Sequence, residues 1–253
     1  MVNVAAGGIA VGLLAGLLSG AFGIGGGIVM VPLLALVLGV GQHEAQGVTL
    51  AVMLLPIGLP AVLTYHRLHP VRWRLAALIA LGFLPGSWAG ARAASALPGR
   101  PLRALFVLFL LYVAWRTWTG PSGSPRRGPP ASDANGLWIG VLAGGLAGLF
   151  GVGGGIVMVT FLVSLLGQSQ HEAQGTSLAV MLPPIGLPGV WVYAQSRGGL
   201  PWGLMAAVAG GFLAGALAGA QVAARTGSRR LARAFGLLVA AAAAALALRL
   251  GGG

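Results

Sequence analysis

Residues 22–31 read FGIGGGIVMV, and residues 150–159 read FGVGGGIVMV. The two decapeptides differ at one position, so the chain carries the same segment twice, 128 residues apart. Three consecutive glycines disfavour a helix because glycine loses more backbone entropy than any other residue. Each copy lies inside a long apolar run, and a single helix of about 35 residues would be about 50 Å long. The bilayer core is only about 30 Å thick. The glycines at 23–27 and 151–155 therefore predict a break between two short helices in each copy.

The composition predicts an all-α polytopic membrane protein whose main environment is the lipid bilayer. The chain is 57% hydrophobic and 7% charged, with a mean hydropathy of +0.90, whereas soluble domains are roughly 25% charged. Since about 20 apolar residues cross a bilayer core, we expect about 8–10 hydrophobic segments. The formal charge of +12 comes from arginines at the ends of apolar runs rather than on one face. Membrane anchoring explains this arrangement better than nucleic-acid binding, so we expect no nucleic acid as a partner.

The repeat extends beyond the glycines and divides the chain into two homologous halves. HEAQGVTLAVMLLPIGLP (residues 43–60) matches HEAQGTSLAVMLPPIGLP (171–188), and GFLPGSWAGA (82–91) matches GFLAGALAGA (211–220). Two copies with so long a period are typical of a duplicated transporter rather than of a solenoid. The segment between them is rich in proline, glycine and serine, which is typical of an exposed linker. We predict two transmembrane repeats and a linker, at residues 1–118, 137–253 and 119–136 respectively.

The two halves are expected to be inverted-topology repeats. Each half contains an odd number of expected crossings, so the second half would start on the opposite side of the membrane. The arginine bias also moves from one loop to the next between the halves. One loop carries more arginines in the first half, Arg67, Arg72 and Arg74 against Arg197. The following loop carries more in the second half, Arg225, Arg229, Arg230 and Arg233 against Arg92, Arg100 and Arg103.

The glycine runs have two interpretations. Small residues let membrane helices approach closely, and GxxxG spacings such as Gly12/Gly16, Gly86/Gly90 and Gly215/Gly219 favour that reading. Three consecutive glycines also unwind a helix at membrane depth, which is tolerated where the backbone lines a cavity. The helix that resumes would then point free N–H groups at an anion. The candidate anion-binding glycines are Gly25, Gly26, Gly27, Gly153, Gly154 and Gly155.

The proline-rich ends of the longer repeat predict a second helix break in each half. Pro56, Pro60, Pro183, Pro184 and Pro188 each remove a backbone donor. Polar side chains in the preceding helix are candidate hydrogen-bond donors to an oxyanion. They are the hydroxyls of Thr49, Thr176 and Ser177 and the amides of Gln46 and Gln174. The alternative for the hydroxyls is a hydrogen bond to the carbonyl one turn earlier in the same helix.

Both glutamates of the chain occupy the same position in the hexapeptide QHEAQG, at 42–47 and 170–175, and Asp133 is the only other acid. Glu44 and Glu172 precede a predicted helix and would favour its dipole as helix caps. Beside His43 and His171, they would alternatively form proton-carrying pairs. An adjacent His–Glu pair lacks the i, i+4 spacing of a metal site, and the chain contains no cysteine, so we predict no metal and no cofactor. The chain also lacks a GxxxxGK[ST] motif and a clustered catalytic constellation, which argues against an ATP-driven pump and an enzyme.

The paired FGxGGG motifs, the GTSL segment at 175–178 and the arginine-flanked apolar segments resemble the TauE/SafE family of sulfite exporters across essentially the whole chain. The resemblance implies outward transport of a small anionic substrate, such as sulfite or an organosulfonate, by a multi-pass protein of the bacterial inner membrane. The first half departs from the motif with GVTL at 47–50. The alternatives are an inverted-repeat cation exchanger that uses Glu44 and Glu172, and a membrane-embedded enzyme. The assembly we expect is a homodimer.

Overall fold

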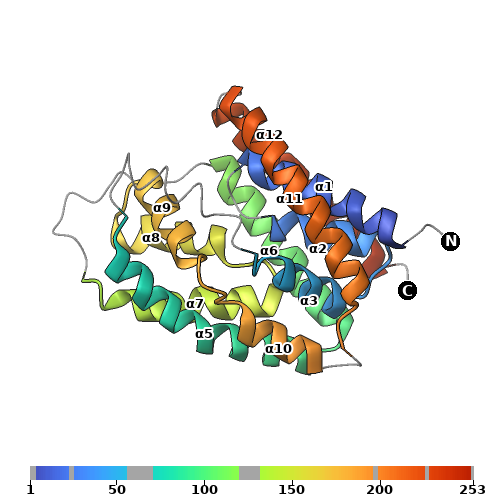
Figure 1. Ribbon diagram of the computed structural model, residues 1–253, viewed down its shortest axis with the longest axis horizontal. Coiled ribbons are helices and arrows are strands. Elements are labelled where there is room, and N and C mark those ends of the chain that lie inside the picture. The colour runs from blue at the N-terminus through green and yellow to red at the C-terminus, as the bar shows by residue number, and fades with distance from the viewer. Residues whose placement is uncertain are drawn as a thin grey trace.

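The computed structural model describes residues 4–22, 26–55, 71–119, 132–195, 199–225 and 228–251, which form eleven helices and no strand (Figure 1). The first half contains α1 (Val4–Phe22), α2 (Gly27–Val37), α3 (Gln42–Val52), α5 (Trp73–Ala96) and α6 (Gly99–Thr119). The second half contains α7 (Asn135–Phe150), α8 (Gly155–Leu166), α9 (Gln170–Val180), α10 (Leu187–Gln195), α11 (Trp202–Arg225) and α12 (Ser228–Gly251). The all-α prediction is confirmed for this part of the chain.

Both predicted glycine breaks are confirmed. Helix α1 ends at Phe22 and α2 begins at Gly27, and α7 ends at Phe150 and α8 begins at Gly155. In the second break, Gly153 and Gly154 have φ angles of +71° and +77°. This left-handed region is costly for any residue with a Cβ atom, so glycine is required for the chain to turn here.

The structure combines long helices with short ones next to the breaks. Three helical segments in the described part of the chain are long and apolar enough to cross a bilayer, namely Trp73–Ala96, Gly99–Thr119 and Trp202–Gly219. Helices α2, α3, α8 and α9 have only 11 or 12 residues. At 1.5 Å per residue, such a helix covers about 17 Å, roughly half of the core. Helix α2 packs against α3, and α8 packs against α9.

The proline break is confirmed in the second half. Helix α9 ends at Val180, and α10 begins at Leu187. Pro183 and Pro184 lie in the connection, where their missing N–H groups need no helical partner. Pro56 and Pro60 of the first half lie outside the described residues.

The two halves are interlocked through close helix pairs. Helix α1 packs against α11, and α5 packs against α7 (Figure 1). A Cβ atom at Gly12 of α1 would collide with the carbonyl oxygen of Val208 in α11, and the repeat equivalents, Gly140 of α7 and Ile79 of α5, make the same contact. The contacts between halves therefore occur in exchanged pairs, as expected from a duplication.

The packing interpretation of the GxxxG spacings is thereby confirmed. An added Cβ would collide with a carbonyl oxygen of the partner helix at Gly16, Gly82, Gly86, Gly90, Gly144, Gly148, Gly211 and Gly215. Without side chains, these helix backbones approach close enough for extensive van der Waals contact.

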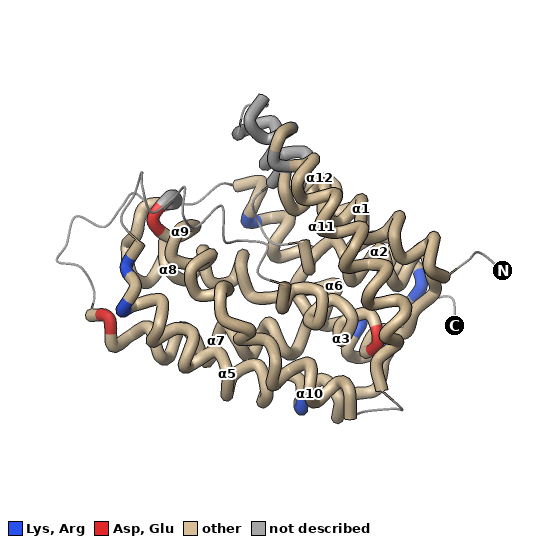
Figure 2. Tube along the Cα trace, in the orientation of Figure 1, with Lys and Arg blue, Asp and Glu red and all other residues tan. Residues whose placement is uncertain are grey.

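Charged groups lie mostly at the outer edge of the view in Figure 2. Arg72 forms an ion pair with Asp133 and joins the starts of α5 and α7. Arg249 donates hydrogen bonds to the carbonyl oxygens of Ala35 (2.9 Å) and Leu36 (3.0 Å). A cation at the carbonyl end of α2 stabilises the helix dipole. These arginines have clear structural roles.

Candidate functional site

The chain breaks of the two halves meet near the centre of the molecule. A Cβ atom at Gly27 would lie 2.6 Å from the carbonyl oxygen of Val152, so the two glycine breaks are in direct contact. A Cβ atom at Gly153 would lie 3.2 Å from Cγ of Met53, which follows the last residue of α3. The two glycine breaks therefore meet, and the end of α3 lies beside them.

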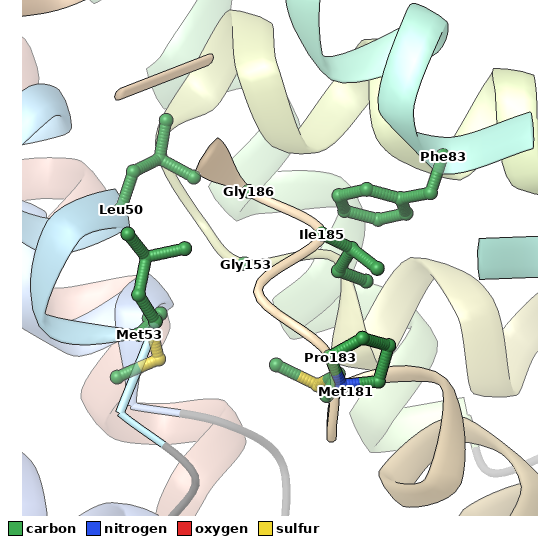
Figure 3. Close-up of a pocket in the computed structure, with 9 residues that line it drawn as sticks. Leu50, Met53, Phe83, Gly153, Met181, Pro183, Ile185 and Gly186 are labelled. Carbon is green, nitrogen blue, oxygen red and sulfur yellow. The ribbon is translucent and has the colours of Figure 1, made fainter. Parts of the chain in front are cut away.

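A small cavity of about 10 Å³ lies at this junction. Figure 3 shows Leu50 of α3 and Met53, which follows α3, on one side. The connection between α9 and α10, with Met181 and Ile185, lies on the other. Phe83 of α5 projects toward the same space. A cavity of this volume holds about one water molecule at most. The centre is closed in this conformation, and its lining side chains are apolar.

Two threonine hydroxyls near this centre lack a protein partner. Thr49 is 0% exposed and Thr176 is 1% exposed, and neither Oγ1 atom has a hydrogen bond within the described structure. Thr49 lies one turn before Met53, whose N–H donates to the Thr49 carbonyl oxygen. The bond to the preceding turn is therefore not made by these hydroxyls. An unsatisfied buried donor costs about 1–3 kcal/mol, which marks both positions as places where a ligand hydrogen bond would be favourable.

The third hydroxyl, Ser177, donates a long hydrogen bond of 3.4 Å to the carbonyl oxygen of Gly155. Ser177 is the repeat equivalent of Thr49 and contacts the first residue of α8. The hydroxyl set predicted in the second half therefore includes one side chain in direct contact with the glycine break.

Gln46 connects three elements of the site. The Tyr193 hydroxyl of α10 lies 2.9 Å from Oε1 of Gln46 and 2.9 Å from the carbonyl oxygen of Gly148 in α7, in position to donate to either. Gln46 is 0% exposed, and its Nε2 atom has no partner in the described structure. A Cβ atom at Gly151 would lie 2.6 Å from Cα of Gln46, so this amide lies beside the second glycine break. Its equivalent, Gln174, is half-buried in α9.

The glycines at the helix starts pack against aromatic rings. A Cβ atom at Gly154 would lie 2.6 Å from Cε2 of Phe83, and Gly26 faces the ring of Phe212 in the same way. These phenylalanines occupy equivalent positions in the repeat. Neither helix-start glycine can cap its helix with a side chain, so N–H groups of the first turn stay available to an anion. Gly155 is buried as the first residue of α8, and Gly25 lies outside the described residues.

His43 and Glu44 of the first half lie in different environments. His43 Nε2 donates to the carbonyl oxygens of Ala94 (2.9 Å) and Leu97 (3.1 Å) at the C-terminal end of α5. His43 is 8% exposed, whereas Glu44 is exposed at the start of α3. The N-cap of α3 is Gly41, which has no side chain to cap the helix.

The second half makes a complete capping box at the same place. The N–H of Ser169 donates to Glu172 Oε2 at 2.9 Å, and the N–H of Glu172 donates to Ser169 Oγ at 3.3 Å. The helix-cap interpretation thus describes Glu172 in this structure. The side chain of His171 lies outside the described part.

Sequence reasoning missed four residues of the site, namely Ser169, Tyr193, Phe83 and Phe212. The S-x-x-E spacing of residues 169–172 was a usable signal for the capping box. Nothing local in the sequence indicates that Tyr193 would reach Gln46, 147 positions away. Among the described residues, no three acidic or histidine side chains gather as a metal site would require.

A comparison with protein families finds a match that covers nearly the whole chain. A family model described as "Sulfite exporter TauE/SafE" matches residues 8–246, which include both glycine breaks and both copies of QHEAQG. Searches of curated proteins and of solved structures found no match.

Proposed function

The chain belongs to the TauE/SafE family of sulfite exporters, and from this membership we propose that it is a secondary transporter that exports small sulfur oxyanions. The family is one of membrane transporters, and the apolar helices of this chain are consistent with that role. The proposed substrates are sulfite and organosulfonates, and the proposed location is the bacterial inner membrane. We propose no catalytic activity for this chain.

Beside the family membership, the structural observation that supports the proposal is the pair of buried, unpartnered hydroxyls of Thr49 and Thr176 near the meeting chain breaks. A sulfur oxyanion has several acceptor oxygens and would satisfy such donors together with the first-turn N–H groups of α2 and α8. Gln46 Nε2 would add a further donor. The donors are neutral, which suits transport because a substrate must leave its site as well as enter it.

The proposed transport cycle opens the closed centre alternately to either side. The cavity of about 10 Å³ has no room for an oxyanion of several atoms, so α3 must move away from the connection between α9 and α10. We propose that the halves are inverted repeats that rock against each other.

Flux measurements test the function directly. Purified protein in proteoliposomes should carry sulfite down its gradient at a rate that rises and saturates with sulfite concentration. Sodium and calcium fluxes should stay at the level of protein-free liposomes, because the described centre holds no carboxylate side chain. Cation flux without sulfite flux would instead establish the cation exchanger.

We further propose that the transport is coupled to protons through the glutamates, with the neighbouring histidines as partners. Glu44→Gln should collapse sulfite flux driven by a pH gradient, because the amide cannot carry a proton, while sulfite binding should persist. Glu172→Gln separates the two roles of its carboxylate, since glutamine also completes a capping box and retains the helix start. Both single variants and the double variant should be measured with and without an imposed pH gradient. Wild-type, gradient-sensitive flux in all three would show that the glutamates act as helix caps only.

A further inference from the structure

A second, much larger cavity of about 290 Å³ lies at the start of α3. The N-cap residue Gly41 and Gln42, His43 and Glu44 of α3 line it, together with Arg103 of α6 and Tyr193 of α10. Its volume is close to the lower end of the range of about 300–1,000 Å³ that is typical of small-molecule sites. The central cavity, by contrast, measures about 10 Å³. Of these two cavities, only the one at the start of α3 can hold a small anion in this conformation.

Polar groups at this cavity lack partners. Gln42 is 2% exposed, and neither its Oε1 nor its Nε2 atom has a hydrogen bond in the described structure. The Nε atom of Arg103 is likewise buried and without a partner there. Leaving buried amide and guanidinium groups unpaired is unfavourable. A ligand with acceptor oxygens would satisfy both groups, and Arg103 would add its positive charge.

The helix start at this cavity also differs from its repeat equivalent. Gly41 has φ and ψ of −61° and 153°, and Ser169 has −63° and 157°, so the two N-cap backbones are nearly identical. Ser169 and Glu172 fill the start of α9 with a carboxylate from the chain itself. Gly41 has no side chain, and Glu44 is exposed. The first half therefore leaves open the position that a carboxylate occupies in the second half.

A buried polar face connects this cavity to the centre. Gln42, Gln46 and Thr49 follow each other at i, i+4 and i+7, which places them on one side of α3. Each is at most 2% exposed, and each has a polar side-chain atom without a partner in the described structure. Tyr193 lines the cavity and contacts Gln46 through its hydroxyl, so it separates the cavity from the inner part of this face.

We propose that this cavity is a one-sided vestibule that binds a small oxyanion before it passes along the Gln42–Gln46–Thr49 face to the centre. The inference rests on the proposed function. Arg103 supplies the charge, and the Gln42 amide and the first N–H groups of α3 supply neutral donors. Glu44 also lines the cavity, and its carboxylate competes with the anion for the start of α3. The second half has no such open site at α9, because Glu172 occupies it.

The first test uses Arg103→Gln, with Arg100→Gln as its matched control. Both changes remove one positive charge from the same end of α6, but Arg100 is exposed and does not line the cavity. Arg103→Gln should raise the KM for sulfite at least about tenfold with little change in kcat, since a charge-assisted hydrogen bond is lost. Arg100→Gln should leave KM within about twofold, as expected for an exposed charge that salt screens. Equal KM values in wild type and Arg103→Gln would overturn the vestibule but leave the exporter function intact.

The second test installs the capping box of the second half in the first half. A Cβ atom at Gly41 meets no heavy atom within 4 Å, so Gly41→Ser places a hydroxyl three residues before Glu44 without strain. The serine should draw the Glu44 carboxylate onto the helix start and raise the KM for sulfite. Gly41→Ala adds the carbon without the oxygen and should raise KM less than serine does. A smaller effect of serine than of alanine would contradict competition at the helix start.

Calorimetric titration of the detergent-solubilised protein with sulfite measures anion binding at the vestibule independently of transport. The central cavity is closed, so the first anion bound by wild-type protein should enter the vestibule. Its affinity should fall at least about tenfold in Arg103→Gln and stay unchanged in Arg100→Gln. This result would support the vestibule even if reconstituted protein failed to move sulfite. Unchanged affinity in Arg103→Gln would overturn it.

Discussion

Replacing Gly154 by leucine should reduce sulfite transport to the level of protein-free liposomes while the protein still inserts into the membrane. A Cβ atom at this position would lie 2.6 Å from Cε2 of Phe83, and the backbone has a φ of +77°. The leucine would displace the Phe83 ring into the central cavity, which it lines. It would also cost about 1–2 kcal/mol in the left-handed backbone region. The start of α8, where the anion is proposed to bind, would be both blocked and displaced.

Gly26→Leu should have the same effect, because Gly26 faces the Phe212 ring as Gly154 faces Phe83. Gly210→Leu is the matched control, since a Cβ atom there meets no heavy atom within 4 Å. Flux in proteoliposomes measures transport, and size-exclusion chromatography of the purified variants measures folding. If the two helix-start variants transported sulfite like wild type, the anion site at the glycine breaks would have to be abandoned.

Gly144→Ala should destabilise the protein, whereas Gly145→Ala should not. A Cβ atom at Gly144 would collide with the carbonyl oxygen of Phe83 in α5, but at Gly145 the nearest atom, the carbonyl oxygen of Gly86, is 3.9 Å away. Overpacking of a tight contact costs about 1–3 kcal/mol, which for a chain of this size lowers Tm by roughly 2–12 °C. Alanine at the neighbouring position gains up to about 1 kcal/mol of helix propensity. Thermal unfolding in detergent measures both.

Gly145→Ala is a close control for Gly144→Ala, because both substitutions add one methyl group to α7 at adjacent positions. Equal Tm changes for the two variants would contradict the close approach of α5 and α7. A lower Tm for Gly144→Ala with unchanged sulfite KM would indicate that the pair holds the fold without contacting the substrate.

The helix breaks were predictable from sequence because their causes are local. Glycine and proline alter the backbone at their own positions, so FGIGGG and the prolines after α9 indicate where helices stop. The exchanged contacts of the two halves follow from the duplication that is visible in the sequence.

The arrangement of the candidate site depends on which helix surfaces pack together. The sequence alone left more than one role open for several of its side chains. The Thr49 hydroxyl could bond within its own helix or face a ligand, and only the packed structure leaves it unpartnered. Glu44 and Glu172 occupy identical hexapeptides, yet Ser169 caps one helix and Gly41 leaves the other open beside Arg103. Local preferences act over about four residues, because that is the reach of a helical turn. The contacts of Gln46 with Tyr193, and of Gly154 with Phe83, join residues far apart in the chain, so only tertiary packing determines them.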